Sequence, residues 1–271
     1  DCISYLFEQA LYLSRSVFGR IVSRLEFERT RKFEASQGSH FDRILITSTV
    51  DAQAFAKLDG FEPAHPVVIL PNGVDLEYFS PGSSPRSENI VIFSGKLSYH
   101  ANVSAALHLV QEIMPIVWEK EPETIVQLAG KDPTRAIKAL AAADARVQVT
   151  GSVADLRPYL RQAALAVAPM LYGAGIQNKV LEAMACGTPL VAYPLAVSGL
   201  PGVTPGAEIL LAHNPHEFGS QILRLLHENE KRYLLSENAY QFINACYSWE
   251  KIGRDLEGIY FDAISQNQLR S

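Results

Sequence analysis

The sequence has few cysteines, no long uninterrupted run of apolar residues and no excess of positive charge, and each shortage excludes a class of protein. Its three cysteines, Cys2, Cys186 and Cys246, are widely separated and do not have the spacing of metal ligands. They therefore favour neither a disulfide framework nor a zinc site, and they fit a reducing cytoplasm. No apolar run reaches the ~20 residues that a membrane-spanning helix needs.

The charge balance gives no general reason to expect a nucleic-acid partner. The 271 residues carry 24 Lys and Arg against 29 Asp and Glu, a net charge of -5, whereas DNA or RNA binding is usually supported by an excess of positive charge. A chain of this length can bury one large core or two ordinary ones. It begins at Asp1 without methionine, and we expect the natural protein to have further N-terminal sequence.

The first part of the chain has elements of mixed type. Between Ile3 and Ala35 apolar residues recur at helical spacing, which predicts a long amphipathic helix interrupted near Gly19. Its arginines alternate with glutamates, so a peripheral contact with anionic lipid at the inner face of the plasma membrane is a minor hypothesis. A strand, a helix and a strand with a Pro-Asn-Gly turn are predicted at residues 42–48, 51–58 and 66–75.

A linker between two domains is predicted at residues 79–89, which are rich in Ser, Pro and Gly. Beyond it, near-continuous apolar segments alternate with helical ones, the pattern of a parallel sheet covered on both faces. The predicted strands are residues 90–95, 124–130, 147–151, 165–170, 188–194 and 208–213. The predicted helices are residues 102–120, 134–143, 155–163, the segment before Gly187, and 215–229. This pattern predicts a doubly wound α/β domain.

Ligands of doubly wound sheets bind beyond the carboxyl ends of the strands. The residues that directly follow the predicted strands are therefore candidates for a binding site. They are Gly95 and Lys96, Gly130 and Lys131, Gly151 to Val153, and Tyr172 to Asn178. We expect these loops to converge on one crevice.

The segment GAGIQNKVLEAMACGTPLV, which starts at Gly173, has residue types suited to a sugar nucleotide. Its glycines let the backbone approach a ligand, and the helix after them offers free N–H groups and a positive dipole end to a phosphate. Lys179 in the first turn opposes that dipole unless an anion binds nearby; a solvent-facing lysine is the alternative. Glu182 in an apolar helix needs a partner. Ribose hydroxyls would serve, and so would a salt bridge with Lys179 or Lys96.

Other loops add weaker candidates. Lys96 is a natural partner for a diphosphate from the other wall of the crevice, or else an exposed turn lysine. Val153 offers an apolar edge to a flat base, while Asp155 is explained equally well as a helix N-cap. The sequence has neither the Gly-x-Gly-x-x-Gly of nicotinamide and flavin enzymes after a strand nor the Gly-x-x-x-x-Gly-Lys-Ser/Thr of P-loop ATPases.

Several segments are together typical of one enzyme family. They are FDRILITSTVDAQ, VVILPNGVDLEYFSP, VIFSGKLSYHAN, GSVADLRPYL, GIQNKVLEAMACGTPLVA and SWEKIGRDLEGIY, and they span nearly the whole chain. The chain resembles retaining glycosyltransferases of family 4, with the GT-B fold of two Rossmann-like domains, and within them sugar transferases of the PEP-CTERM/EpsH1 exopolysaccharide-associated group. The resemblance implies transfer from a nucleotide-sugar donor, UDP- or GDP-linked, with retention at the anomeric carbon and without a metal.

The resemblance also implies roles for individual residues. Lys96 matches the basic residue after the first strand of the donor domain, and Glu182 matches the glutamate that hydrogen-bonds the donor ribose; together with Lys179, which we add from its place in the helix, they form the expected catalytic set. The residues expected to contact the donor are Gly95, Val153, Leu156, Tyr172, Gly175, Ile176, Gln177 and Asn178. The acceptor would be a glycan or a polyprenyl-linked intermediate, and the protein would be cytoplasmic.

Two positions depart from the family pattern. Many members have a glutamate eight positions ahead of the ribose-binding one, where this chain has Ala174, and a basic residue beyond Lys96, where it has Asn102. We expect Lys179 to supply the missing positive charge. The family further implies that the first half of the acceptor domain precedes Asp1, so that this chain alone would bind donor without transferring the sugar.

The expected GT-B architecture divides the chain into three segments. Residues 1–83 would be the remnant of the acceptor domain, 84–247 the donor domain, and 248–271 a helix that crosses back, in which Trp249 packs rather than stacks on substrate. Two other functions stay open. One is a GT-B nucleotide-sugar epimerase, which would convert the donor without an acceptor. The other is a catalytically silent module that binds a nucleotide sugar or a partner in polysaccharide assembly, an alternative that Ala174 and Asn102 keep open.

Overall fold

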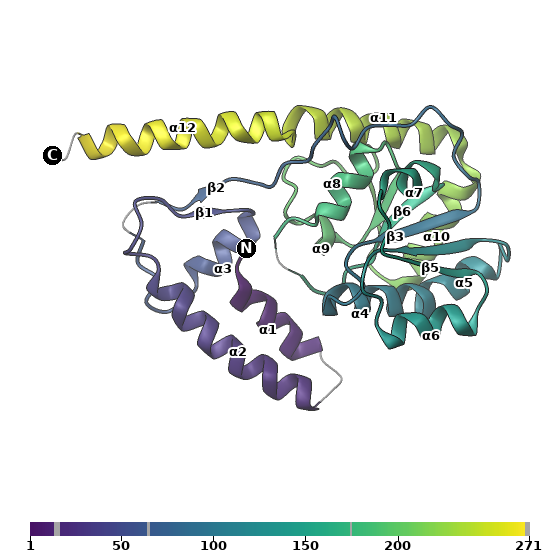
Figure 1. Ribbon diagram of the computed structural model, residues 1–271, viewed down its shortest axis with the longest axis horizontal. Coiled ribbons are helices and arrows are strands. Elements are labelled where there is room, and N and C mark those ends of the chain that lie inside the picture. Colours follow the sequence, from purple (N-terminus) through teal and green to yellow (C-terminus); the bar gives the residue numbers. More distant parts are fainter. Residues whose placement is uncertain (14–16, 64–65, 174, 269–271) are drawn as a thin grey trace.

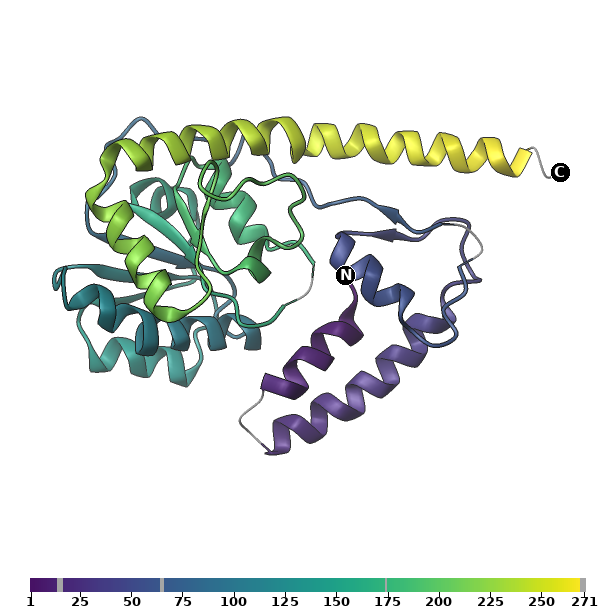
Figure 2. The ribbon, with the colours of Figure 1, turned by 180° about the vertical axis from the view of Figure 1, so that it is seen from behind.

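The computed structural model describes residues 1–13, 17–63, 66–173 and 175–268 of the chain. It contains two parallel sheets, one of two strands and one of six, with helices around them, which confirms the predicted α/β class. Figures 1 and 2 show that the two sheets lie apart, each with its own helices. The chain connects them twice, through the segment after β2 (Val68–Ile69) and through the long helix α12 (Trp249–Gln268).

The smaller part has three helices and the two-stranded sheet. Its helices are α1 (Ile3–Leu13), α2 (Val17–Ser36) and α3 (Thr49–Ala56), and β1 (Leu45–Ile46) pairs in parallel with β2. Gly19 itself lies within α2, so the predicted helix is not interrupted at that residue; α1 ends at Leu13 and α2 begins at Val17, and the residues between them lie outside the described part of the chain.

Two buried carboxylates hold the start of α1. Glu34 accepts a hydrogen bond from the backbone N–H of Ile3 at 2.7 Å, and Asp51 accepts one from the N–H of Cys2 at 3.0 Å. Carboxylates at a helix N-terminus pair with unsatisfied N–H groups and with the positive end of the dipole. Helix α1 is thereby fixed to both α2 and α3.

The six-stranded sheet is entirely parallel, in the order β5-β4-β3-β6-β7-β8. Its strands are β3 (Ile90–Ser94), β4 (Ile125–Ala129), β5 (Val147–Gly151), β6 (Leu165–Ala168), β7 (Leu190–Ala192) and β8 (Leu210–Leu211). Each lies within a predicted strand. The chain builds outward from β3 to β5 and then crosses back to β6, so the order reverses between β3 and β6. Loops diverge at such a switch point, which is where doubly wound sheets bind ligands.

Helices cover both faces of this sheet. Figure 1 shows α4 (His100–His108), α5 (Met114–Trp118) and α6 (Arg135–Ala143) on one face and α7 (Arg157–Gln162) and α8 (Asn178–Ala185) on the other. The remaining helices are α9 (Pro194–Val197), α10 (Pro215–His227) and α11 (Asn229–Cys246), of which α9 and α11 were not predicted. The helix predicted at residues 102–120 contains a π-helical turn, η1 (Leu109–Ile113), just before Pro115. Proline lacks the N–H that would continue a regular α-helical ladder.

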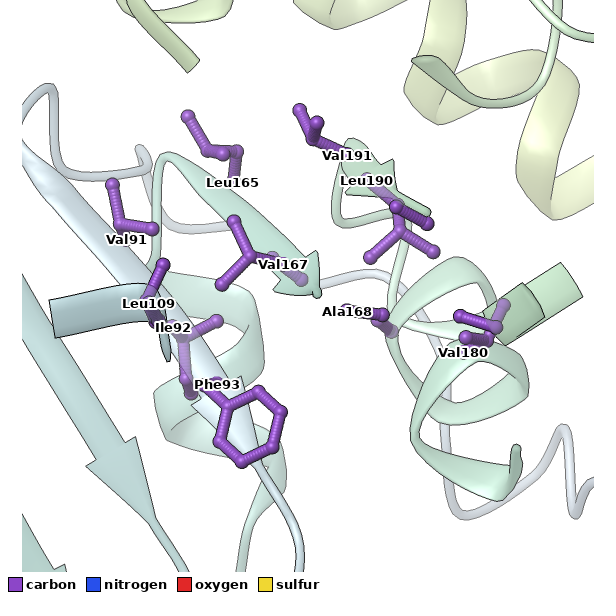
Figure 3. Packing of buried hydrophobic residues seen from close by; sticks show 14 of the residues in the cluster. Val91, Ile92, Phe93, Leu109, Leu165, Val167, Ala168, Val180, Leu190 and Val191 are labelled. Atoms are coloured by element: carbon purple, nitrogen blue, oxygen red, sulfur yellow. The ribbon is translucent and has the colours of Figure 1, made fainter. Parts of the chain in front are cut away.

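The core lies between the sheet and these helices. Figure 3 shows buried aliphatic and aromatic side chains from neighbouring strands packed together with side chains from η1 and α8. They include Val91, Ile92 and Phe93 of β3, Leu165 and Val167 of β6, Leu190 and Val191 of β7, Leu109 of η1 and Val180 of α8. Near-continuous apolar strands are therefore buried on both faces, as the sequence pattern predicts.

Helix α12 extends from the six-stranded part along the smaller part. It starts beside a bridge between Val74 and Ser248, and near its end Gln266 accepts a hydrogen bond from Arg43. At its start, a Cβ added at Gly73 would lie 2.7 Å from the ring of Trp249, so Trp249 packs closely on this glycine. Neither α12 nor any other helix in the described residues is long and apolar enough to cross a membrane.

Candidate functional site

The loops after β3 and β4 lie against each other and against the end of β5 at the carboxyl edge of the sheet. The N–H of Leu97 donates to the carbonyl of Lys131 at 2.9 Å, and the N–H of Gly130 donates to Thr150 Oγ1 at 3.3 Å. A Cβ at Gly130 would lie 1.8 Å from the carbonyl oxygen of Gly95, so only glycine fits there. Two of the four predicted loops, those after β3 and β4, are therefore in direct contact.

Lys179 is a mostly buried cation beside the loop after β3, at the place where the sequence predicts a crevice. It is the second residue of α8, and its Nζ donates to Asn102 Oδ1 at 2.8 Å and to Gln177 Oε1 at 3.2 Å, with Met170 Sδ at 3.7 Å. Burial lowers the pKa of Lys179 from 10.5 to about 8, although the charge of Glu182 opposes the shift. The side chain therefore does not extend into solvent as an ordinary surface lysine would.

Asn102 fixes the position of this lysine. It is buried in the first turn of α4, where its Oδ1 accepts from Lys179 and its Nδ2 donates to the carbonyl of Lys96 at 3.0 Å. Gly95 makes room, because a Cβ there would lie 2.8 Å from Asn102 Nδ2 and 3.2 Å from Lys179 Cε. Sequence reasoning treated Asn102 only as a departure from a family pattern. Asn102 comes six residues after Lys96, in the first turn of the helix that follows β3. This position at the carboxyl end of a strand could have marked it as a candidate site residue.

Glu182 lies on the same helix, one turn after Lys179, and is half-buried. Burial raises the pKa of the Glu182 carboxyl, and the nearby Lys179 charge lowers it by a smaller amount. In the described residues no group donates a hydrogen bond to this carboxylate, and no ion pair joins it to Lys179 or Lys96, so the salt-bridge alternative is not observed. A partly desolvated acceptor without a protein donor is suited to hydroxyl groups of a ligand.

The loop before α8 brings backbone and amide groups to the crevice. Gly175 has φ +67°, a left-handed conformation that glycine adopts without strain. Gln177 is the N-cap residue of α8 but makes no side-chain cap, because its Oε1 accepts from Lys179. The Ile176 side chain is buried in the core, so only its backbone is available to a ligand. Asn178 Oδ1 accepts from Asn72 Nδ2 at 3.2 Å.

The other predicted residues are less closely associated with Lys179. Lys96 is exposed, and its side chain contacts neither Lys179 nor Glu182 through a hydrogen bond or ion pair in the described residues. Val153 is half-buried in the loop after β5, and Leu156 packs partly against the core. Ala174 lies outside the described residues. The N-cap prediction for Asp155 was wrong, because the N-cap of α7 is Leu156; the Asp155 carboxylate instead accepts from the N–H of Arg157 at 2.9 Å and forms an ion pair with that side chain.

Tyr172, in the loop after β6, contacts His100, a residue that the sequence did not indicate as part of the site. Its hydroxyl is 3.0 Å from His100 Nδ1, and the two rings are stacked with centroids 5.4 Å apart. Next to it, the N–H of Gly173 donates to Gln9 Oε1 of α1 at 3.0 Å. Helix α1 of the smaller part therefore reaches the rim of the crevice.

The part of the chain that the structure describes contains no cluster of three or more His, Cys, Asp or Glu side chains placed to hold a metal ion. The polar groups gathered at the crevice are instead one buried ammonium, one half-buried carboxylate, side-chain amides and backbone N–H groups. This set suits a ligand that carries both an anionic group and hydroxyl groups.

Comparison of sequences relates the chain to sugar-transferring enzymes. A family model described as "Glycosyl transferases group 1" matches residues 88–228, which is more than half of the chain. D-inositol 3-phosphate glycosyltransferase of Salinispora tropica is 25% identical, over 84% of this chain and 52% of its own length. The Mycobacterium tuberculosis protein of the same name is 27% identical, over 83% of this chain and 49% of its own length. The chain thus spans about half the length of the curated relatives it matches.

Comparison of structures agrees. Sucrose-phosphate synthase from Thermosynechococcus elongatus superposes with a TM-score of 0.73 at 22% identity, over 88% of this chain and 62% of that one. Anabaena Alr3699/HepE, solved with UDP and glucose, gives 0.72 at 16% identity, over 86% and 67%. At these identities the likeness establishes the fold, which is GT-B. Because the family model covers more than half of it, the chain belongs to the glycosyl transferases group 1 family.

Proposed function

We propose that the protein containing this chain transfers a sugar from a nucleotide-sugar donor, bound in the crevice between β3 and β6, to a glycan or polyprenyl-linked acceptor. The observation that carries the proposal is the pair on α8 formed by Lys179, a buried ammonium, and Glu182, a half-buried carboxylate with no donor from the described residues. A ligand that satisfies both side chains needs an anionic group close to hydroxyl groups. A nucleoside diphosphate has this combination in its phosphates and ribose.

The diphosphate would bind at Lys179. Burial penalises the charged lysine, and a bound anion offsets that penalty. The first turn of α8 adds backbone N–H groups and the positive end of the helix dipole, both of which favour phosphate. Lys96 is exposed at the end of β3 and forms no ion pair with the described residues. Its backbone carbonyl accepts from Asn102, which also binds Lys179, so the Lys96 side chain could approach the same anion.

The nucleoside would bind at Glu182 and the loop after β5. The carboxylate would accept hydrogen bonds from the ribose hydroxyls, and Val153 and Leu156 would lie beside the base. UDP and GDP are the nucleotides we favour. The structure of Anabaena Alr3699/HepE with UDP and glucose supports UDP as the first to test.

We further propose a retaining reaction of the family 4 type, without a metal and without a covalent nucleophile. Such a reaction relies on positioning and on electrostatic stabilisation of the leaving diphosphate, which Lys96, Lys179 and the N-terminus of α8 would provide. A role in exopolysaccharide or cell-surface glycan synthesis, as in the PEP-CTERM/EpsH1-associated group, is part of the same proposal. It rests on the sequence motifs alone.

A cytoplasmic protein that contacts the inner face of the plasma membrane fits this role. Helix α2 exposes the apolar residues Ile21, Leu25 and Phe33 beside the basic residues Arg20 and Arg24. Amphipathic helices with basic residues bind anionic lipid surfaces. Sedimentation with anionic liposomes tests this contact, and the Arg20→Gln/Arg24→Gln variant should sediment less.

A catalytically silent nucleotide-sugar-binding module is the second candidate. It is favoured by Asn102, a neutral residue that uses both ends of its amide within the protein where many family members have a basic side chain. A module of this kind would bind the donor but neither hydrolyse nor transfer it.

Release of UDP or GDP from the nucleotide sugar by the full-length protein tests the two candidates against each other. UDP-glucose and GDP-mannose are incubated with the protein, with and without a polyprenyl phosphate acceptor, and the free nucleotide is measured. Release that depends on Lys179 and Glu182 supports the glycosyltransferase. Binding of donor without any release supports the silent module, and absence of binding contradicts both.

A further inference from the structure

A second cluster of side chains lies at the rim of the crevice, apart from Lys179 and Glu182. Tyr172 comes from the loop after β6 and His100 from the start of α4, and they meet with 3.0 Å between the Tyr172 hydroxyl and His100 Nδ1. Their rings stack at 5.4 Å with an interplanar angle of 13°. The ring of Tyr99 also contacts the cluster, with its centroid 4.6 Å from that of His100.

The cluster is neutral near pH 7. Burial lowers the pKa of His100 and raises the pKa of Tyr172 to about 12, so neither ring carries a charge at neutral pH. Because Nδ1 is engaged with the Tyr172 hydroxyl, the His100 nitrogen that is left for a ligand is Nε2, which makes no hydrogen bond with any described residue. Neutral rings with one free polar atom suit an uncharged polar ligand better than an anion.

The polar groups follow one another across the switch point in a definite order. Glu182 and Lys179 lie on α8 at one face of the sheet, and Asn102 and His100 lie in the first turn of α4 at the other face. The bond between Lys179 and Asn102 joins the two faces. Taken along α8, across this bond and back along α4, the groups are a carboxylate, an ammonium, an amide and the neutral aromatic pair.

A nucleotide sugar presents its groups in a matching order, as nucleoside, diphosphate and sugar. With the ribose at Glu182 and the diphosphate at Lys179, the sugar falls at the face that His100 and Tyr172 occupy. The residue in the adjacent loop at position 174 is alanine, which has no polar side chain to contribute. The hydroxyls of the sugar then need partners from another element, and α4 contacts both Tyr172 and Lys179 through His100 and Asn102.

We propose that His100 and Tyr172 bind the sugar moiety of the donor and contribute to the choice of sugar. His100 Nε2 hydrogen-bonds one sugar hydroxyl, the Tyr172 hydroxyl orients the His100 ring, and Tyr99 contacts the same ring. This inference rests on the proposed function, because it assumes that a nucleotide sugar is the ligand.

Calorimetric titration with matched ligands tests it. The wild-type protein and the His100→Phe and Tyr172→Phe variants, which keep both rings, are titrated with UDP, UDP-glucose and UDP-galactose, or with GDP, GDP-glucose and GDP-mannose if the protein binds GDP. We expect the affinity for the free nucleotide to stay within about twofold in both variants. We expect the affinity for the preferred sugar nucleotide to fall about three- to tenfold, the value of one neutral hydrogen bond, and the preference between the two sugars to shrink.

Binding of the free nucleotide also serves as a control for folding, because a misfolded variant would bind neither the nucleotide nor the sugar nucleotide. Ser98→Ala, a change of an exposed polar residue in the same loop, is the control and should alter no affinity. If the variants bind nucleotide and sugar nucleotides as the wild type does, or lose both equally, His100 and Tyr172 do not recognise the sugar while the proposed function stands. If the folded wild type binds no nucleotide at all, the proposed function fails and this inference with it.

Discussion

The ammonium of Lys179 and the side-chain carbonyl of Asn102 are 2.8 Å apart, and this hydrogen bond joins the two helices that flank the switch point of the sheet. Asn102 is itself fixed by its bond to the carbonyl of Lys96. A neutral residue therefore positions a cation that comes from a different helix. The predictions below test whether this arrangement holds a diphosphate and which residues it depends on.

Binding of UDP or GDP should weaken as the pH rises above about 8. The pKa of Lys179 in the free protein is lowered to about 8, so below that pH the lysine is charged both before and after binding. A bound diphosphate raises the pKa of the lysine, and above pH 8 binding must take up a proton, at a cost of up to about tenfold in affinity per pH unit. Calorimetry at pH 7, 8 and 9 in buffers of different ionisation enthalpy measures both the affinity and the proton uptake.

Two variants of Lys179 serve as controls for this dependence. Lys179→Met should bind about 10- to 100-fold more weakly at pH 7, the value of a hydrogen bond to a charged group, and should show no proton uptake. Lys179→Arg stays charged throughout and should lose the decline above pH 8. An identical pH profile in Lys179→Met and the wild type would show that another group is responsible.

Replacing Glu182 by Gln should weaken the binding of nucleotides that have both ribose hydroxyls. The carboxylate accepts two charge-assisted hydrogen bonds in our account, and the amide keeps only one acceptor oxygen, so we expect a loss of about 10-fold or more. The same substitution should change the affinity for the 2′,3′-dideoxy nucleotide little. Calorimetric titration of both proteins with both ligands completes the cycle, with Glu237→Gln on the exposed side of α11 as the control. If the losses of affinity caused by the substitution and by removal of the ribose hydroxyls are additive, Glu182 does not interact with the ribose.

Replacing Gly95 by Ala should disturb the crevice more than replacing Gly151 by Ala. Both glycines have positive φ, +143° and +68°, so both substitutions strain the backbone. A Cβ at Gly95 would in addition displace Asn102 and Lys179, whereas a Cβ at Gly151 would have no other atom within 4 Å. We expect Gly95→Ala alone to lower nucleotide affinity, by about tenfold. Comparable affinities in the two variants, compared at equal folded fraction, would contradict the described packing.

Replacing Arg86 by Met should destabilise the six-stranded part without touching the crevice. The guanidinium donates six hydrogen bonds at 2.7 to 3.2 Å, five to backbone carbonyls at the C-terminal ends of α7 and α8 and one to Thr188. Its removal takes the side-chain donor from the carbonyls of Arg161, Ala163 and Cys186, whereas those of Leu160 and Gly187 keep Thr188 and Ser236, so we expect the free energy of unfolding to fall by about 2 to 4 kcal/mol. Urea denaturation measures it. Arg135→Met, an exposed residue of α6, should change stability by less than about 0.5 kcal/mol.

The fold was largely predictable because its strands are buried on both faces. Runs such as residues 90–93 and 165–168 are apolar throughout, which marks a parallel sheet, and all six strands of the larger sheet lie where the sequence predicts. The strands predicted at residues 42–48 and 66–75 of the smaller part are also present, but each is shorter than predicted and has only two paired residues. The π turn ahead of Pro115 was missed because helical spacing of apolar residues does not distinguish α from π geometry.

The site was predictable where the chemistry is local and was missed where it depends on contacts across the sheet. Lys179 and Glu182 stand out within one helix, because a cation in the first turn and a carboxylate among apolar residues each need a partner. The roles of Asn102 and His100 depend on which loop faces which, through contacts to Lys179 and Tyr172. Spacing along the sequence does not contain that information.

Titration of the protein with UDP, GDP, ADP and CMP is the most direct test of the central claim that the crevice between β3 and β6 binds a nucleoside diphosphate. Our account predicts selective binding of UDP or GDP over the other nucleotides, and loss of about tenfold or more of that affinity in Lys179→Met. A folded protein that binds none of the four, or binds one of them equally well without Lys179, would contradict it.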